Sequence, residues 1–168
     1  RQGTINLAPD VKRGFVWDDT RRSRLIESVM LKIPLPMFYV AATKHGAWDV
    51  VDGIQRLSAI RDFLLGSNQD GNGFILTGLE FWGGPFNKKT YNKIKEDDRY
   101  VRIVNNIMET ELRFTVINPG TPEEVKRNVF RRINTGGMPL TPQEIRHALY
   151  QGKSTRFLTR LVESESFK

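Results

Sequence analysis

Residues 48–65, which read WDVVDGIQRLSAIRDFLL, decide the fold. The first four residues are rich in aromatic and β-branched side chains, which favour a strand over Trp48–Val51. Asp52 and Gly53 follow, and apolar residues then recur with the spacing of one helix face. These apolar residues are Leu57, Ile60 and Leu64. The stretch therefore predicts a strand that turns through a glycine into a helix.

A turn of this kind predicts an anion-binding site at the start of the helix. The first backbone N–H groups of a helix lack intrahelical partners, and the helix dipole adds about half a positive charge there. Gly53 has no side chain, so a phosphate could approach the backbone closely, and Gln55 and Arg56 fall in the first turn. In a plainer interpretation, Asp52 only caps the helix by accepting from the N–H of Gln55, and Arg56 only faces solvent.

The composition favours a polyanionic partner. The 168 residues suit one domain, and they include no cysteine, which excludes disulfides and thiolate chemistry and fits a reducing cytoplasm. Lys and Arg number 26 against 19 Asp and Glu, which gives a net charge of +7 and a pI of about 9.9. This charge favours nucleic acid or nucleotide, although solubility alone would also account for it. No apolar run approaches the length of a membrane span, so no membrane contact is expected.

The whole pattern predicts an α+β fold in a single domain over residues 1–168. A mixed core of strands and helices is expected over 1–118, and a helical extension over 119–168. Strands are expected at 5–7, 37–42, 48–51, 74–79 and 112–117, the last of them half buried because its apolar residues alternate. Helices are expected at 18–31, 54–65, 90–108 in two pieces, 121–133, 141–152 and 155–163.

Two kinds of local motif add detail to this pattern. Thr121–Glu124 and Thr141–Glu144 both start with Thr-Pro and end with Glu, which predicts a capping box with proline at the first helical position. The loop Phe81–Phe86 combines aromatic residues with glycine. Such a loop either stacks on nucleic-acid bases or fills a small satellite core, and we favour the core.

Four motifs, in order and at fitting spacing, cover nearly the whole chain. They are Pro9–Trp17, Arg24–Ser28 with Ile33–Pro36, Asp52–Leu57, and Phe130–Gly137 with Leu140. Together they resemble the N-terminal domain of GmrSD-type modification-dependent restriction proteins, whose signature reads Asp-Gly-Gln-Gln-Arg, within the ParB/sulfiredoxin-like superfamily. Lys12 and Ile54 stand where that family has glutamine. The resemblance implies a small mixed sheet with a helical C-terminal part, in a prokaryotic or phage-related protein of DNA restriction or antiviral defence.

The resemblance also implies a site for a nucleoside triphosphate, either GTP, ATP or CTP. Asp52 would hold Mg²⁺ through water, Gln55 would position an attacking water, and Arg56 would stabilise the charge on the leaving phosphate. These three residues form the expected catalytic set. Asn134 either contacts the nucleotide or only closes a helix C-terminus. The residues expected to contact the nucleotide are Arg13, Gly53, Ile54, Arg56 and Asn134.

Three functions remain, in order of preference. The first is a nucleotide-binding regulatory domain, with or without hydrolysis, of a DNA restriction protein. The second is a DNA-binding module without catalysis, and the third is a metal-dependent nuclease. The residues expected to contact DNA are Lys12, Arg21, Arg22, Arg24 and Arg132. The chain begins at Arg1 rather than Met, so we expect a fragment of a longer protein with a further C-terminal domain, and assembly into a homo-oligomer stays open.

Overall fold

The computed structural model describes residues 5–7, 17–66, 74–135 and 149–151. Contacts along the chain divide it into two compact units. The first unit consists of Arg1–Val11, Pro36–Ile54 and Arg113–Ser154, and the second of Lys12–Leu35, Gln55–Leu112 and Thr155–Lys168. The predicted boundary at residue 118 stays a prediction.

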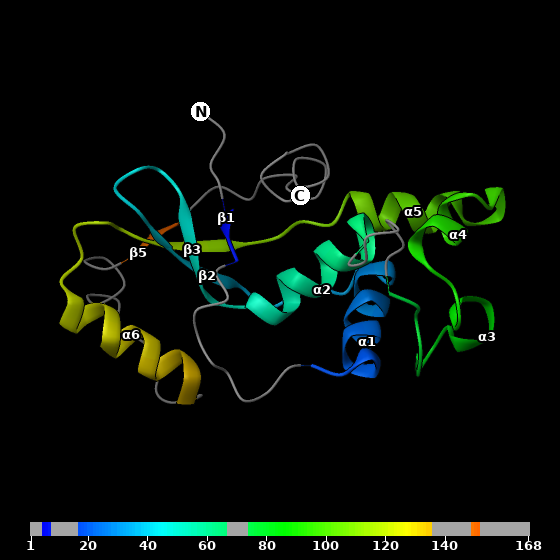
Figure 1. Cartoon of the computed structure of the whole chain (residues 1–168), viewed down its shortest axis with the longest axis horizontal. Helices are drawn as coiled ribbons and strands as arrows, with labels where there is room; N and C mark the ends of the chain where they lie inside the picture. The colour runs from blue at the N-terminus through cyan, green and yellow to red at the C-terminus, as the bar shows by residue number, and fades with distance from the viewer. Residues whose placement is uncertain (1–4, 8–16, 67–73, 136–148, 152–168) are drawn as a thin grey trace. The chain divides into compact units, whose positions relative to one another are not determined.

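The first unit contains a five-stranded mixed sheet with the strand order β1-β3-β2-β4-β5 (Figure 1). The β1–β3 and β2–β4 pairs are parallel, whereas the β2–β3 and β4–β5 pairs are antiparallel. Together with the helices, this sheet confirms the predicted α+β class. The strands are β1 (Ile5–Asn6), β2 (Phe38–Ala42), β3 (Trp48–Asp52), β4 (Phe114–Ile117) and β5 (Leu149–Gln151).

The strands predicted at 37–42 and 48–51 are confirmed as β2 and β3, which form an antiparallel hairpin. Its turn is closed by a hydrogen bond from the N–H of Thr43 to the carbonyl of Ala47 at 2.8 Å. Gly46 adopts a φ of 81° in this turn, a left-handed conformation that glycine takes without steric cost. A register shift between Tyr39 and Val40 marks a bulge in β2.

Helix α6 (Glu123–Thr135) lies along one face of this sheet (Figure 1). Val129 of α6 packs on Val51 and Ile117, and all three are buried. The partly buried residues around them are Tyr39, Ala41, Val125 and Ile133. The predicted helix is therefore confirmed, although its expected capping bond is not. The side-chain oxygen of Thr121 is buried and has no hydrogen-bond partner in the described part of the chain.

Two predictions about the strands of this unit are wrong. The alternation of residues 112–117 predicted a half-buried strand, but all four residues of β4 are buried, because β4 lies inside the sheet between β2 and β5. The prediction of a helix over 141–152 is also wrong at its C-terminal end. Residues 149–151 instead form β5, paired antiparallel with β4, so pairing across the sheet overrides the helical spacing. The start of that helix and the helix predicted at 155–163 lie outside the described residues.

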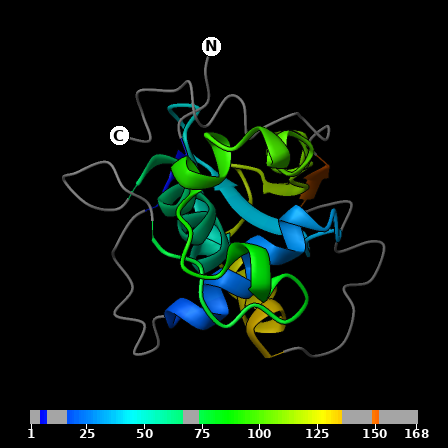
Figure 2. The same cartoon turned by 90° about the vertical axis from the view of Figure 1, so that its right-hand side faces the viewer.

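The second unit is built from helices (Figure 2, blue to green). The helix predicted at 18–31 is confirmed as α1, and its N-cap is Asp18, whose Oδ1 accepts from the N–H of Arg21 at 2.7 Å. The two-piece helix predicted over 90–108 is also confirmed. The helical elements are α1 (Asp19–Met30), α2 (Ile54–Leu65), α3 (Gly83–Phe86), α4 (Tyr91–Lys95), the 3₁₀ helix η1 (Asp98–Tyr100) and α5 (Val101–Met108).

The strand predicted at 74–79 does not form. Phe74 and Leu76 are buried, but the backbone of this segment bonds to a side chain of α1 and to residues 88–89, which form no strand. The N–H of Thr77 donates to the hydroxyl of Ser23 at 3.0 Å. The N–H of Leu76 donates to the carbonyl of Lys89 at 3.0 Å, and its carbonyl accepts from the N–H of Lys88 at 2.8 Å. The segment therefore satisfies part of its backbone without joining the sheet.

Aromatic residues hold the helices of the second unit together. The ring of Phe63 lies 5.5 Å from that of Phe74 and 5.6 Å from that of Tyr91. In the predicted aromatic loop, Phe86 is buried and packs on Trp82 at 5.8 Å, which confirms the satellite core. No helix in the described ranges has the length and apolar content that a bilayer span requires.

Candidate nucleotide site and family

The predicted turn from strand to helix is present. Strand β3 ends at Asp52, α2 begins at Ile54, and Gly53 stands between them with a φ of 96°. Gly53 is buried and directly precedes Ile54, the first residue of α2. The start of α2 therefore combines a turn residue without a side chain with the positive end of a helix of 12 residues.

Gln55, in the first turn of α2, binds the segment that precedes α1. Its Oε1 accepts a hydrogen bond from the backbone N–H of Trp17 at 3.4 Å. The guanidinium of Arg21 lies over the ring of Trp17, 4.7 Å from its centroid. The NH₂ group of Gln55 can donate to a ligand, and its carbonyl oxygen keeps a second lone pair beside the bond from Trp17.

The three arginines predicted to contact DNA from α1 have different surroundings. Arg22 pairs with Asp62 at 2.8 Å and with Asp19 at 3.3 Å, and its side chain is only 19% exposed. Arg24 pairs with Glu80 at 3.0 Å and is about half exposed. Arg21 is exposed. These contacts favour a structural role for Arg22 and leave Arg21 as the arginine of this helix best placed to meet a polyanion.

A model of one protein family matches residues 1–151, and the family is described as the GmrSD restriction endonuclease, N-terminal domain. The match spans most of the chain and includes the turn at Gly53. The chain belongs to this GmrSD N-terminal domain family. No curated protein and no solved structure matches it. Placement in the wider ParB/sulfiredoxin-like superfamily stays a prediction.

Other residues predicted for the GmrSD-type site lie partly outside the described structure. Lys12 and Arg13 are outside the described residues, as is the side chain of Asn134, whose backbone belongs to the last turn of α6. Arg132 lies in the same turn and is half-buried. The turn of β3 into α2 thus brings together Asp52, Gly53, Ile54, Gln55 and Arg56 from the predicted set.

Asp52 is the acidic residue of this turn and is half-buried. Within the described ranges, no group of three or more His, Cys, Asp or Glu side chains could hold a metal ion by itself. A Mg²⁺ ion at Asp52 would therefore take most of its ligands from water and nucleotide phosphates, which is how this ion is commonly held in nucleotide sites.

The sequence did not predict the role of Glu27 in α1. Its carboxylate is 3% exposed and accepts hydrogen bonds from three backbone N–H groups. The donors are Glu80, Phe81 and Trp82, at 2.8–2.9 Å. A weak indication of its burial was available in the sequence. Glu27 stands three residues before the apolar Met30, so the two share one side of the helix.

Proposed function

We propose that this GmrSD-family domain binds a nucleoside triphosphate at the start of α2. The observation that supports the proposal most is Gly53, which joins a strand to a helix at a φ of 96° and has no side chain at this turn. The N–H groups of the first turn would donate to phosphate oxygens, as they do at other strand–glycine–helix turns. In a longer protein, the domain would report the nucleotide state to a DNA restriction or defence activity.

Arg56 supplies the charge in this proposal. It lies in the first turn of α2, where a guanidinium can form two parallel hydrogen bonds with a phosphate. Asp52, at the end of β3, would hold Mg²⁺ through water between the phosphates and the protein. If the nucleotide is hydrolysed, these two charges would act on the negative charge that develops on the leaving phosphate.

Gln55 and Ile54 bear on hydrolysis rather than on binding. Gln55 has an NH₂ group that can donate, and the bond from the N–H of Trp17 to its Oε1 helps to hold the side chain in place. Ile54 adds no polar group at the first helical position. We therefore propose that the site favours nucleotide binding, with slow hydrolysis at most, since a single donor amide is left to orient a water molecule.

A calorimetric titration tests this proposal. The chain is titrated with GTP, ATP and CTP, each with and without Mg²⁺, while phosphate release is followed in parallel. We expect binding of at least one nucleotide, and a loss of roughly 10- to 100-fold in affinity for Arg56→Ala, because a hydrogen bond to a charged group contributes about 1.5–3 kcal/mol.

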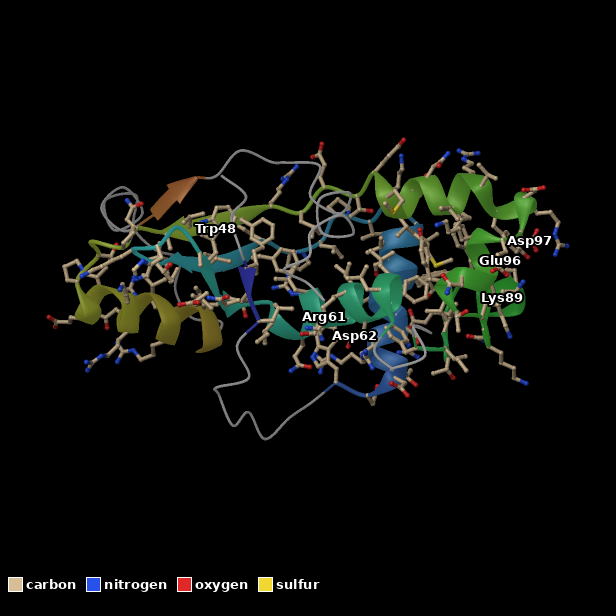
Figure 3. The ribbon with its side chains drawn as sticks, turned by 45° about the horizontal axis from the view of Figure 1, so that its top comes forward. Trp48, Arg61, Asp62, Lys89, Glu96 and Asp97 are labelled. Carbon is tan, nitrogen blue, oxygen red and sulfur yellow. The ribbon has the colours of Figure 1, made fainter. Side chains whose placement is uncertain are left out.

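Arg61→Ala is the matched control for this titration. Arg61 lies further along the same helix, and its guanidinium bonds Asp62 at 2.7 and 2.8 Å (Figure 3). Thermal unfolding of both variants shows whether the fold is retained. Equal nucleotide affinity in wild type and Arg56→Ala would exclude the proposed site, whereas equal losses in both variants would indicate a general effect of helix charge.

DNA is the second partner that we propose. The net charge of +7 and the family's restriction endonuclease description both support a contact with DNA. Arg21 and Arg24 on α1 are the exposed candidates among the arginines predicted for it, and Arg24 is paired with Glu80. Binding of duplex DNA that weakens steeply with salt, and weakens further in Arg21→Ala, would support this contact, and a flat salt dependence would contradict it.

A further inference from the structure

A surface of the second unit has no part in the proposed nucleotide site. It is formed by residues 79–95, which contain one highly exposed aromatic ring, Phe81 at 70% exposure, and four lysines. No acidic residue occurs between Phe81 and Lys95 in the sequence. We call this stretch the lysine–aromatic segment. A single exposed aromatic residue is common on proteins, so the argument depends on how the segment is held and charged.

The backbone on either side of Phe81 is fixed. The buried carboxylate of Glu27 accepts from the N–H of Phe81 at 2.8 Å and from those of its two neighbours, Glu80 and Trp82. The ring of Trp82 packs on Phe86, so the chain directly after Phe81 is anchored as well. The exposed ring thus stands on a pre-organised backbone and loses little conformational freedom on binding a ligand.

A second turn with a fixed backbone carries Lys88, the first lysine of the segment. Lys88 has a φ of 66°, which is rare for a residue with a side chain, and its N–H donates to the carbonyl of Leu76 at 2.8 Å. The N–H of Leu79 donates to Oδ1 of Asn87 at 3.3 Å, which closes the loop between Phe81 and Lys88. The exposed ring and the exposed ammonium group therefore belong to one small closed loop.

An aromatic row connects this loop to the rest of the segment. Phe86 packs on Tyr100 with 4.8 Å between ring centroids. Lys89 places its Nζ 4.9 Å from the centroid of Tyr100, and Arg99 lies over the same ring at 5.4 Å (Lys89 is labelled in Figure 3). The cation–π contact holds the Lys89 side chain along the row, while Lys88, Lys93 and Lys95 are exposed.

Near this surface, the lysines outnumber the acidic residues that are not paired with an arginine. Asp97 is paired with Arg99 at 2.7 Å, and Glu80 is paired with Arg24 at 3.0 Å. Two acidic residues just after the segment, Glu96 and Asp98, are exposed (Figure 3 labels Glu96). Four lysines against these two carboxylates give the segment a positive charge that suits a polyanion with spaced charges.

We propose that the lysine–aromatic segment binds single-stranded nucleic acid. Phe81 would stack on an unpaired base, and the lysines would contact the phosphates on either side of it. An exposed aromatic face recognises a base only when that base has left the duplex stack, so the combination favours a single strand over a duplex. This site goes beyond the proposed nucleotide function, because it uses none of the residues at the start of α2.

Fluorescence anisotropy with a labelled oligothymidylate and a matched duplex tests this proposal. We expect the chain to bind the single strand more tightly, and Phe81→Ala to lose roughly tenfold in affinity for the single strand with little change for the duplex. Phe81→Trp should retain the affinity, because the indole also stacks. Lys88→Asn with Lys89→Gln should lower the dependence of log affinity on log salt by about 1.4, at about 0.7 for each phosphate contact removed.

Two control variants distinguish binding at this surface from a general effect of losing a lysine or an exposed apolar side chain. Lys44→Gln removes an exposed lysine from the first unit, and Ile33→Ala removes an exposed aliphatic side chain from the second unit. Neither control should change binding. Asparagine is chosen at Lys88 because it tolerates a positive φ. Nucleotide affinity should be unchanged in all these variants, so failure here is distinguishable from failure of the nucleotide site.

Several results would overturn the proposal. Unchanged affinity of Phe81→Ala for the single strand would do so, as would an equal loss for single strand and duplex, because both exclude stacking. A wild-type preference for the duplex would also contradict it. If none of the variants alters binding to either nucleic acid, the surface does not bind nucleic acid, and a protein partner becomes the alternative.

Discussion

The carboxylate of Glu27 accepts a hydrogen bond from the backbone N–H of Trp82 at 2.8 Å, although 55 residues separate the two in the sequence. The same carboxylate accepts from the N–H groups of Glu80 and Phe81, so helix α1 fixes the chain that leads into α3. Hydrogen bonds to an ionised acceptor are roughly twice as strong as neutral ones. Three of them can offset the cost of burying this charge.

Glu27→Ala should therefore destabilise the fold strongly. The change leaves three backbone N–H groups without their acceptor, and each unsatisfied buried donor costs about 1–3 kcal/mol. We expect a loss of about 3–5 kcal/mol in the free energy of unfolding, with a smaller loss for Glu27→Gln, which keeps one carbonyl oxygen. Urea unfolding measures both. Glu111→Gln, at an exposed glutamate, is the control, and a loss below about 0.5 kcal/mol for Glu27→Ala would contradict this account of the anchor.

Arg22→Ala should destabilise the protein more than Arg21→Ala. Arg22 pairs with Asp62 at 2.8 Å, with side chains 19% and 15% exposed, and its guanidinium lies 4.3 Å from the ring centroid of Phe74. Removing one partner of such a shielded pair should cost about 2–4 kcal/mol, against about 1 kcal/mol or less for Arg21. Chemical unfolding of both arginine variants compares their stabilities. Adding Asp62→Ala and the double variant Arg22→Ala/Asp62→Ala gives the coupling energy of the pair. Equal free energies of unfolding for the two arginine variants would contradict a stabilising role for the Arg22–Asp62 pair.

Gly53→Ala should destabilise the turn before α2. A φ of 96° brings an added Cβ into steric conflict with the backbone, which costs about 1–2 kcal/mol. Gly120→Ala is the matched control in the same unit, because a Cβ there would meet no atom within 4 Å. Thermal unfolding should show a lower melting temperature for Gly53→Ala only. If both variants melt together, the left-handed conformation of Gly53 is not required.

Asp97 should titrate at unusually low pH. Its hydrogen bond with Arg99 lowers the pKa of Asp97 from 3.8 to about 2, and the same contact raises the pKa of Arg99. Because the folded pKa lies below the unfolded one, the stabilisation is complete above about pH 5 and is lost as the pH falls from about 4 towards 2. This exposed pair should contribute little to the free energy of unfolding.

An NMR titration of the Asp97 carboxyl carbon measures this effect. The midpoint should lie near 2 in the wild-type chain and rise towards 3.8 in Arg99→Gln. The difference in unfolding free energy between wild type and Asp97→Asn should also stay constant over the neutral range, where Asp97 is ionised in both states. The same midpoint in both chains would show that Arg99 does not hold this carboxylate.

Local sequence patterns predicted the elements that depend on local physics. The helix near 18–31, the glycine turn at Gly53 and the buried Leu57 and Ile60 of α2 each follow from residues a few positions apart. The expected third residue of that stripe, Leu64, is only half-buried. The errors occur where distant segments decide the backbone. Residues 74–79 were predicted as a strand, yet their backbone bonds to Ser23 of α1 and to residues 88–89. Residues 149–151 form a strand because β4 offers an edge to pair with.

The candidate site shows the same division. The residue types around Gly53 indicated a phosphate site from their order alone, and the family match agrees with the signature that they resemble. No pattern indicated that Gln55 would bond the backbone of Trp17, or that Arg22 would be shielded by Asp62 and Phe74. Those contacts depend on which side chains the tertiary fold brings together, and sequence spacing does not contain that information.

The measurement that tests nucleotide binding at the start of α2 most directly is a map of backbone amide shifts on addition of Mg²⁺ and nucleotide. We predict that the largest changes occur at the N–H groups of Gly53, Ile54 and Gln55, because these groups would donate to phosphate oxygens. The changes should vanish in Arg56→Ala and persist in Arg61→Ala. Binding whose amide shifts lie elsewhere in the chain, with residues 53–56 unchanged, would contradict the proposed site.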